Sequence, residues 1–255
     1  MVTAAWAPFL DEISRWRDSG RTVEFWWRDD DAGSPSPALE RLLLLASQVE
    51  VPLALAAVPD EASRDAFLDA GPQVTVIQHG VDHRNRAASG EKKTEFPPAE
   101  PTEAALKRLA SGRMRLESAA GPRFLPVLAP PWNRLSAPLL PGLSAAGLIG
   151  LSRFGVRKVT NSGLIEVNTH VDIIDWKTTR AFCGVEQALG QAVRHLVARR
   201  AGTADAEEAT GWLTHHAVHD EACWSFLGRL FEATSALDGV RWRRANALFA
   251  PARGA

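Results

Sequence analysis

Residues 21–58 read RTVEFWWRDDDAGSPSPALERLLLLASQVEVPLALAAV, and this stretch decides the fold. The run at 21–27 predicts a strand, and the run at 52–58 predicts a second strand of the buried type. Between them, residues 37–49 predict a helix that begins at a proline. A strand, a helix and a strand in this order are typical of a βαβ unit, in which the two strands run parallel.

The same alternation continues along the chain and favours a barrel. Six or seven such units without a glycine-rich dinucleotide-binding motif favour a (β/α) barrel over an open sheet. No linker divides the chain, so we expect residues 1–255 to form a single domain. The other expected strands cover 73–79, 123–132, 148–154, 163–176 and 209–220, and the other expected helices cover 60–70, 102–120, 137–147, 184–202 and 221–237.

Composition excludes several classes of function. The net charge is −1 and no basic stripe is present, so nucleic acid is not an expected partner. Two cysteines, Cys183 and Cys223, make no disulfide framework and fit a reducing compartment. Asp11 and Glu12 interrupt the N-terminal segment, which predicts an amphipathic helix rather than a signal peptide. With no apolar run long enough to cross a bilayer, we expect a cytoplasmic protein without a membrane partner.

Polar residues follow the predicted strands repeatedly. In a parallel barrel, the carboxyl ends of the strands share one face, and this face carries the active site. Each group taken alone is weak evidence, but five such groups at five strand ends are improbable as accidents. The groups are Asp29–Asp31, His79 with His83, Pro130–Arg134, Asp172 with Asp175–Trp176, and His215 with His216 and His219.

Two histidines four residues apart, in the sequence QHGVDH at 78–83, indicate a metal site. Their spacing suits two ligands of one ion, although two residues alone do not make a site. A catalytic zinc ion takes three protein ligands and keeps one position open, so a carboxylate from another strand end would complete the set.

The ordered set of motifs resembles the polysaccharide deacetylase family, which is the NodB-homology fold of carbohydrate esterase family four. The order is a double Asp after the first strand, His-x-x-x-His, Pro-Pro-aromatic, Asp-Trp and Leu-x-His, and it spans roughly 23–231. The resemblance implies a distorted (β/α) barrel with about seven parallel strands. It also implies one divalent metal ion, usually zinc, and hydrolysis of an N-acetyl group or a related amide on a sugar.

The resemblance also implies roles for individual residues. Asp31, His79 and His83 would bind the metal, and Asp30 would be the general base, although Asp29–Asp30 is an alternative pair. His215 would be the general acid, although His216 is an alternative, and Asp175 would orient this histidine. The backbone N–H of Trp132 would contribute to the oxyanion hole, and Trp176 belongs to the Asp-Trp element.

Ala129 departs from the family pattern. The family usually has an Arg directly before Pro130-Pro131, where it pairs with the base, and here Arg28 or Arg134 could take that place. Arg134, just after Trp132, is also a predicted substrate-binding residue. Three tryptophans near the expected site could stack on a sugar ring: Trp132, Trp176 and Trp212. For Trp212, packing at the barrel rim is favoured over contact with the sugar.

Three functions remain open at this point. The first is removal of an N-acetyl group from an intracellular sugar or sugar conjugate, since no export signal is seen. The second is hydrolysis of a small non-sugar amide by the same chemistry. The third is a non-catalytic carbohydrate-binding or regulatory protein, which Ala129 favours. The charged segment 84–101 is expected to form a loop at the rim.

Overall fold

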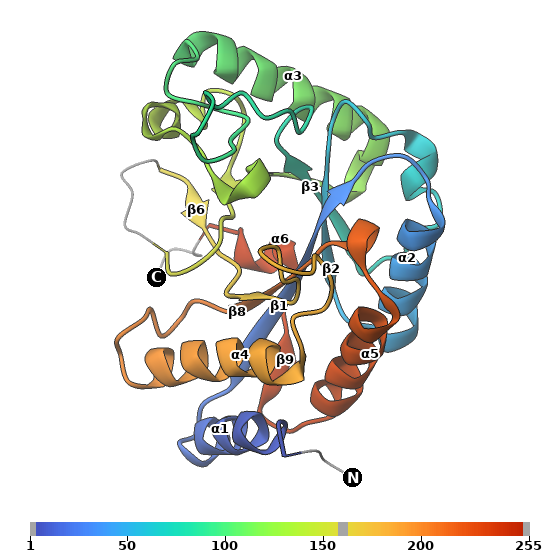
Figure 1. Ribbon diagram of the computed structural model, residues 1–255, viewed down its shortest axis with the longest axis vertical. Helices are drawn as coiled ribbons and strands as arrows, with labels where there is room; N and C mark the ends of the chain where they lie inside the picture. The colour runs from blue at the N-terminus through green and yellow to red at the C-terminus, as the bar shows by residue number, and fades with distance from the viewer. Residues whose placement is uncertain (1–3, 158–162, 252–255) are drawn as a thin grey trace.

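A curved parallel sheet surrounded by helices forms the centre of the molecule (Figure 1). The structure is a computed structural model that describes residues 4–157 and 163–251. Its nine strands have the order β6-β5-β4-β3-β2-β1-β8-β7, with β9 paired to β1. Every pairing between these strands is parallel, which confirms the predicted distorted (β/α) barrel with two strands more than the expected seven.

The long strands lie where they are predicted but differ in their ends: β1 continues to Ala32, five residues beyond the expected end, and β4 and β8 stop at Ala129 and Thr214, before their expected ends. Three of the other strands are only two residues long. The expected strand at 163–176 is in fact two short strands with irregular chain between them, β6 and β7. The strands are β1 (Val23–Ala32), β2 (Leu53–Ala57), β3 (Val74–His79), β4 (Phe124–Ala129), β5 (Gly150–Leu151), β6 (Ile165–Glu166), β7 (Val171–Asp172), β8 (Thr210–Thr214) and β9 (Val240–Trp242).

The long helices also lie where they are predicted. The shorter ones are 3₁₀ turns: the expected helix at 60–70 is only η1, and the one at 137–147 is η4, where Pro141 removes a backbone donor. The helices are α1 (Ala7–Asp18), α2 (Pro37–Val49), α3 (Thr102–Ala120), α4 (Val185–Arg200), α5 (Glu221–Ser235) and α6 (Ala245–Leu248), with 3₁₀ turns η1 (Arg64–Phe67), η2 (Gly121–Arg123), η3 (Pro131–Asn133), η4 (Ala137–Gly142) and η5 (His216–Val218).

Successive side chains of β1 point to opposite faces of the sheet, as the strand geometry requires. Phe25 and Trp27 belong to the large hydrophobic cluster that the sheet forms with the outer helices. Trp26 belongs to a smaller cluster inside the curve of the sheet, with Ala129 of β4 and Phe249 after α6. Since Phe249 packs against Trp26, the α6 end of the interior is filled. The opposite end, where the strands finish, is left for polar residues.

The N-terminal helix α1 forms as its pattern predicts, with Phe9, Ile13 and Trp16 buried. Glu12 is buried on the same face and is paired with Arg200 of α4, at 2.7 and 3.1 Å. Among the described helices, none is both long enough and apolar enough to span a membrane.

Candidate metal centre and active site

Three predicted metal ligands converge at the carboxyl ends of β1 and β3. Asp31 lies at a bulge in β1, where the register with β2 shifts, and its φ is 68°. The bulge turns Asp31 toward the same side as the preceding aspartate. His79 ends β3, and His83 lies in the turn that follows it. Asp31 Oδ1 lies 3.1 Å from His79 Nε2 and 3.2 Å from His83 Nε2.

These three side chains fit a divalent metal ion. Two atoms bound to one tetrahedral zinc ion at about 2.0–2.2 Å lie roughly 3.3–3.6 Å apart, a few tenths of an ångström more than the separations observed here. Asp31 Oδ1 is buried and has no hydrogen-bond partner, so a cation would satisfy it. Two imidazoles and a carboxylate are the donors that zinc prefers in catalytic sites.

Electrostatics around the three ligands favour a cation. Burial alone would raise the pKa of Asp31, but the nearby histidines, His79 first, lower it well below its usual value. Burial opposes a charge on His79, yet Asp30 and Asp31 raise the pKa of His79 above its ordinary value. Burial and the neighbouring His79 lower the pKa of His83. The two aspartates thus favour positive charge at His79, and a metal ion bound there would take the place of a proton.

The turn that carries His83 is fixed by Glu95, which the sequence analysis did not single out. Glu95 is fully buried, and its carboxylate accepts hydrogen bonds from the backbone N–H groups of Val81, at 3.0 and 3.2 Å, and of Asp82, at 3.3 Å. Burial raises the pKa of Glu95. Arg108 of α3 lies 3.2 Å from the same carboxylate. The segment 84–101 thus forms the predicted loop, and through Glu95 it also holds the turn that carries the metal ligand His83.

Replacing Gly80 with alanine is expected to destabilise this turn. Gly80 has a φ of +58°, and an added Cβ would lie 2.1 Å from Glu95 Oε2 and 2.6 Å from Pro131. Overpacking and the left-handed backbone together cost about 2–4 kcal/mol. Gly90→Ala is the matched control. Gly90 also has a positive φ, +83°, but a Cβ added there would have no atom within 4 Å. Urea unfolding that gives equal losses for the two variants would contradict this role of Gly80.

Asp30 is fixed by an arginine on its own strand. Arg28 Nε lies 2.8 Å from Asp30 Oδ1, and Arg28 Nη2 donates to Asp30 Oδ2 at 3.0 Å. The guanidinium also donates to Asn133 Oδ1 at 2.8 Å and to Ser152 Oγ at 2.7 Å. Arg28 is fully buried, and it is the arginine that accompanies the candidate base. Of the two arginines that could replace the one missing at Ala129, the structure therefore selects Arg28.

Arg134 lies outside this network. Its guanidinium donates to the carbonyl oxygen of Lys93 at 2.8 Å, and its side chain is exposed. The prediction that Arg134 binds substrate or accompanies the base is therefore not supported by its position. Instead, Arg134 connects the loop after β4 to the loop 84–101.

The candidate acid His215 lies across the site from the metal ligands. His215 Nε2 is 3.9 Å from Asp30 Oδ2, and His79 Nδ1 is 4.0 Å from the same oxygen. Asp30 is therefore situated between a metal ligand and the candidate acid. The ring of Trp176 meets the ring of His215 edge-on, with centroids 4.6 Å apart.

Asp175 does not contact His215, contrary to the prediction. Its carboxylate accepts hydrogen bonds from the backbone N–H groups of Lys177, at 3.0 Å, and Thr178, at 3.1 Å. The side chain of Thr178 first, and then these backbone groups, lower the pKa of Asp175. Asp172 of β7 lies closer to the site: it accepts a hydrogen bond from Trp176 Nε1 at 2.9 Å. Burial raises the pKa of Asp172, and the charge of His215 acts in the opposite direction. At this end of β7, the carboxylate that interacts electrostatically with His215 is thus Asp172 and not Asp175.

The alternative residues for base and acid are engaged elsewhere. Asp29 and His216 contact each other behind the site, with Nδ1 of His216 2.5 Å from Oδ1 of Asp29. Both side chains are buried, so the geometry favours Asp30–Asp31 over Asp29–Asp30 as the working pair, and His215 over His216 as the acid.

Two of the three tryptophans expected near the site mouth are there. The ring of Trp132 lies 4.5 Å from that of His83, and Trp132 has a φ of 55°. Four of the six non-glycine residues with positive φ in the described chain lie at this site, where backbone strain is often concentrated. Trp212 is fully buried and packs against Phe9 and Phe25, so it is a core residue.

A second group of potential metal ligands, His170, His195 and Glu208, is buried between α4 and the sheet. The backbone N–H of Gly211 donates to Nδ1 of His170 at 3.1 Å. Burial lowers the pKa of His170, and Nε2 of the ring faces Glu208 at 3.5 Å. Because Nδ1 accepts the backbone hydrogen bond, Nε2 is the nitrogen that carries the proton of a neutral ring, so this group fits a metal ion less well than the strand-end site.

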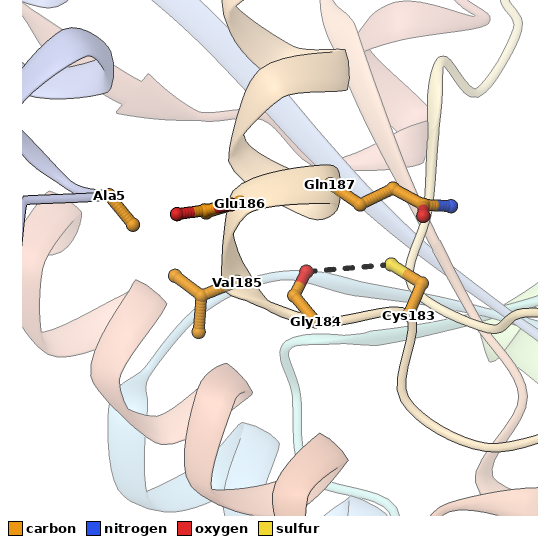
Figure 2. Close-up of a pocket in the computed structure, with 6 residues that line it drawn as sticks. All are labelled: Ala5, Cys183, Gly184, Val185, Glu186 and Gln187. Atoms are coloured by element: carbon orange, nitrogen blue, oxygen red, sulfur yellow. Dashed lines mark hydrogen bonds between the residues drawn. The ribbon is translucent and has the colours of Figure 1, made fainter.

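A broad open hollow lies away from these residues, at the start of α4 (Figure 2). It has a volume of about 760 Å³ and is lined by Ala5 and residues 183–187. Its only thiol, Cys183, contacts the carbonyl oxygens of Asp172 and Gly184, and burial raises the pKa of Cys183 to about 11. An un-ionised thiol is a poor nucleophile, so the hollow offers no catalytic group to compete with the strand-end site.

Comparison with solved structures identifies the fold. No family model and no curated protein matches the sequence. The chain is 18% identical to a T48 deacetylase solved with substrate, with a TM-score of 0.52 over 89% of this chain and 91% of that one. It is 13% identical to a family 4 acetyl xylan esterase from Clostridium thermocellum, solved with a cobalt ion, with a TM-score of 0.52 over 89% and 90% of the chains.

A peptidoglycan deacetylase from Bacillus subtilis is 14% identical, with a TM-score of 0.54 over 89% of this chain and 90% of that one. At these identities the comparison shows a shared fold. The resemblance to polysaccharide deacetylases that the motifs predict is therefore confirmed for the architecture of nearly the whole chain.

Proposed function

We propose that this protein is a metal-dependent amide hydrolase that removes an N-acetyl group from a sugar or sugar conjugate. The observation that carries the proposal is the convergence of five groups at the carboxyl ends of β1, β3 and β8. These groups are Asp31, His79 and His83 as ligands, Asp30 as base and His215 as acid. The fold shared with a T48 deacetylase and a peptidoglycan deacetylase supports the same function.

One divalent ion, zinc by its donor set, would be bound by Asp31, His79 and His83. The cobalt ion of the acetyl xylan esterase shows that a relative of this fold binds a divalent cation. When bound, the ion supplies positive charge that polarises the acetyl carbonyl and acidifies water.

The two protein groups that move protons lie on either side of the attacked bond. Asp30 accepts a proton from water as the oxygen of that water bonds to the carbonyl carbon. Because an amine is a poor leaving group, His215 donates a proton to the nitrogen as the C–N bond breaks. The products are acetate and the free amine of the sugar. Asp30 Oδ2 and His215 Nε2 lie 3.9 Å apart, which places both within reach of one bound amide.

Trp132 and Trp176 would bind and orient the sugar. The backbone N–H of Trp132 is a donor for the oxyanion, and such a donor typically contributes about 3–4 kcal/mol to the activation free energy. Trp176 remains 39% exposed next to His215, so its ring is open to contact with a sugar.

Asp172→Asn is expected to lower activity more than Asp175→Asn. Asp172 is hydrogen-bonded to Trp176 and interacts electrostatically with His215, whereas Asp175 accepts hydrogen bonds within its own turn. A misplaced catalytic group costs about 10²-fold in rate. We therefore expect a loss of about 10–100-fold in kcat for Asp172→Asn and less than about twofold for Asp175→Asn. Steady-state kinetics giving the opposite order would restore Asp175 as the partner of His215.

A non-catalytic binding protein is the competing reading, and the geometry weakens it. Ala129 favours that reading because it removes the expected arginine. Arg28 would supply the positive charge next to the base in place of that arginine, since it contacts both carboxylate oxygens of Asp30.

Acetate release tests the proposed function directly. Purified protein, with and without one equivalent of zinc, would be incubated with N-acetylglucosamine, its short oligomers and small non-sugar N-acetyl amides. We expect zinc-dependent release from a sugar substrate. Release from the non-sugar amides alone would favour the small-amide reading, and bound zinc without any release would favour the binding-protein reading.

A further inference from the structure

Two features of the sequence are not used by the mechanism, and the structure places them in contact. One is the additional aspartate Asp29, which precedes Asp30 and Asp31. The other is His216, which follows His215. Oδ1 of Asp29 lies 2.5 Å from Nδ1 of His216, and both side chains are at least 96% buried.

The carboxylate of Asp29 connects the end of β1 to the turn after β8. In the sheet, Asp29 lies opposite Thr214. Its Oδ2 accepts hydrogen bonds from the hydroxyl of Thr214 at 2.5 Å and from the backbone N–H of His216 at 3.1 Å. The same hydroxyl accepts a hydrogen bond from Trp27 Nε1 at 2.8 Å. One carboxylate thus has three partners on the adjoining strand and turn.

The location of this pair relative to the proton-transfer groups follows from strand geometry. Neighbouring residues of a strand point to opposite faces. Asp30 is inside the curve of the sheet with Arg28, whereas Asp29 is on the outer face with Trp27. The Asp29–His216 pair therefore lies directly behind Asp30 and His215, one residue from each of them.

The backbone of His215 has a second contact that limits its movement. Its N–H donates to Nε2 of His219 at 3.4 Å, and the ring of His219 meets that of Trp224 edge-on, with centroids 4.5 Å apart. The turn after β8 is therefore connected both to β1, through Asp29, and to α5, through His219.

We propose that Asp29 and His216 are positioning residues that set the distance between the base Asp30 and the acid His215. This inference rests on the proposed function, because it assigns the pair an effect on that reaction. The pair touches no reacting atom. Without it, the turn after β8 would lose its side-chain contact with β1 at His216, and the hydrogen bond from Trp27 to Thr214 would hold only the preceding residue of β8.

The test compares Asp29→Asn, His216→Asn and the double variant in zinc-loaded protein. We expect kcat to fall about 10–100-fold in each single variant, because a shift of about 1 Å in a catalytic group has an effect of this size. We expect KM to change less than about threefold and the zinc content to stay the same, because the ligands and Trp132 are untouched. Since the two residues act as a unit, the double variant should lose about as much as one single variant.

Glu12→Gln is the matched control for loss of stability. Glu12 is likewise a fully buried carboxylate, but its partner is Arg200 and it lies on α1. We expect this variant to unfold more easily and to keep its kcat. A fall in kcat for Glu12→Gln equal to that for Asp29→Asn would overturn the inference, and so would multiplied losses in the double variant.

Crystal structures of the wild type and Asp29→Asn separate this inference from the proposed function. If the wild type releases no acetate, the proposed function fails, and the distance from Asp30 Oδ2 to His215 Nε2 still reports on positioning. We expect that distance to depart from the native 3.9 Å by at least about 0.5 Å in the variant. An unchanged distance together with an unchanged kcat would overturn the inference.

Discussion

Replacing His79 and His83 together with alanine is expected to abolish metal binding at the strand-end site and, with it, hydrolysis. The two imidazoles supply two of the three ligand atoms, and Asp31 alone cannot retain the ion. A bound ion stabilises the transition state by several kcal/mol, and about 4 kcal/mol corresponds to about 10³-fold in rate. We therefore expect a loss of at least about 10³-fold in kcat/KM.

Elemental analysis and acetate release measure the two parts of this prediction on the same samples. Wild-type protein stripped with a chelator is the control, since added zinc should restore its activity. Added zinc should leave the double variant inactive. A variant that keeps its metal, or that keeps activity after losing it, would contradict the assignment of these ligands.

Replacing Asp30 with asparagine is expected to lower kcat about 10²–10⁴-fold while the metal content stays unchanged. An amide has nearly the shape of the carboxylate but cannot accept the proton. Asp31, His79 and His83 remain in place, so the loss should appear in kcat and leave metal binding intact.

Asp30→Asn is also expected to reduce stability, because Arg28 is fully buried and Asp30 is the carboxylate that contacts it. Leaving a buried cation without its anion costs about 3–5 kcal/mol, and the amide oxygen offsets part of this. Urea unfolding and steady-state kinetics on the same protein separate the two effects. Activity within about threefold of wild type in folded, metal-loaded protein would exclude Asp30 as the base.

Strand periodicity could have decided one question that the sequence analysis left open. Arg28 and Asp30 are two residues apart in a strand, so their side chains share a face. Arg134 lies in a loop, where no periodicity fixes its direction, and it donates to a backbone carbonyl of another loop. The sequence analysis ended the first strand at residue 27, however, so this periodicity applies to Arg28 and Asp30 only because β1 continues to Ala32.

The assignment of Asp175 failed because the chain turns where the motif suggests a strand. The expected strand at 163–176 ends at Asp172, and the next residues form a turn in which Asp175 accepts hydrogen bonds from nearby N–H groups. A short Asp-Trp motif contains no signal for this end point. Trp176 reaches the site nevertheless, because it donates a hydrogen bond back to Asp172.

Glu95 could not be predicted for a different reason. It lies in a loop without periodicity, and its partners Val81 and Asp82 precede it by 14 and 13 residues. The carboxylate of Glu95 reaches the turn at Gly80 only when the chain is folded. By contrast, long elements such as α2, α3 and β3 follow from their apolar patterns to within a residue or two.

The central claim is that Asp31, His79 and His83 bind a divalent metal ion next to Asp30 and His215. An anomalous difference map from crystals grown with zinc tests it most directly. The account predicts one strong peak about 2.0–2.2 Å from Asp31 Oδ1 and from Nε2 of both histidines. Zinc-containing crystals without a peak at this position would contradict the claim and, with it, the proposed hydrolase.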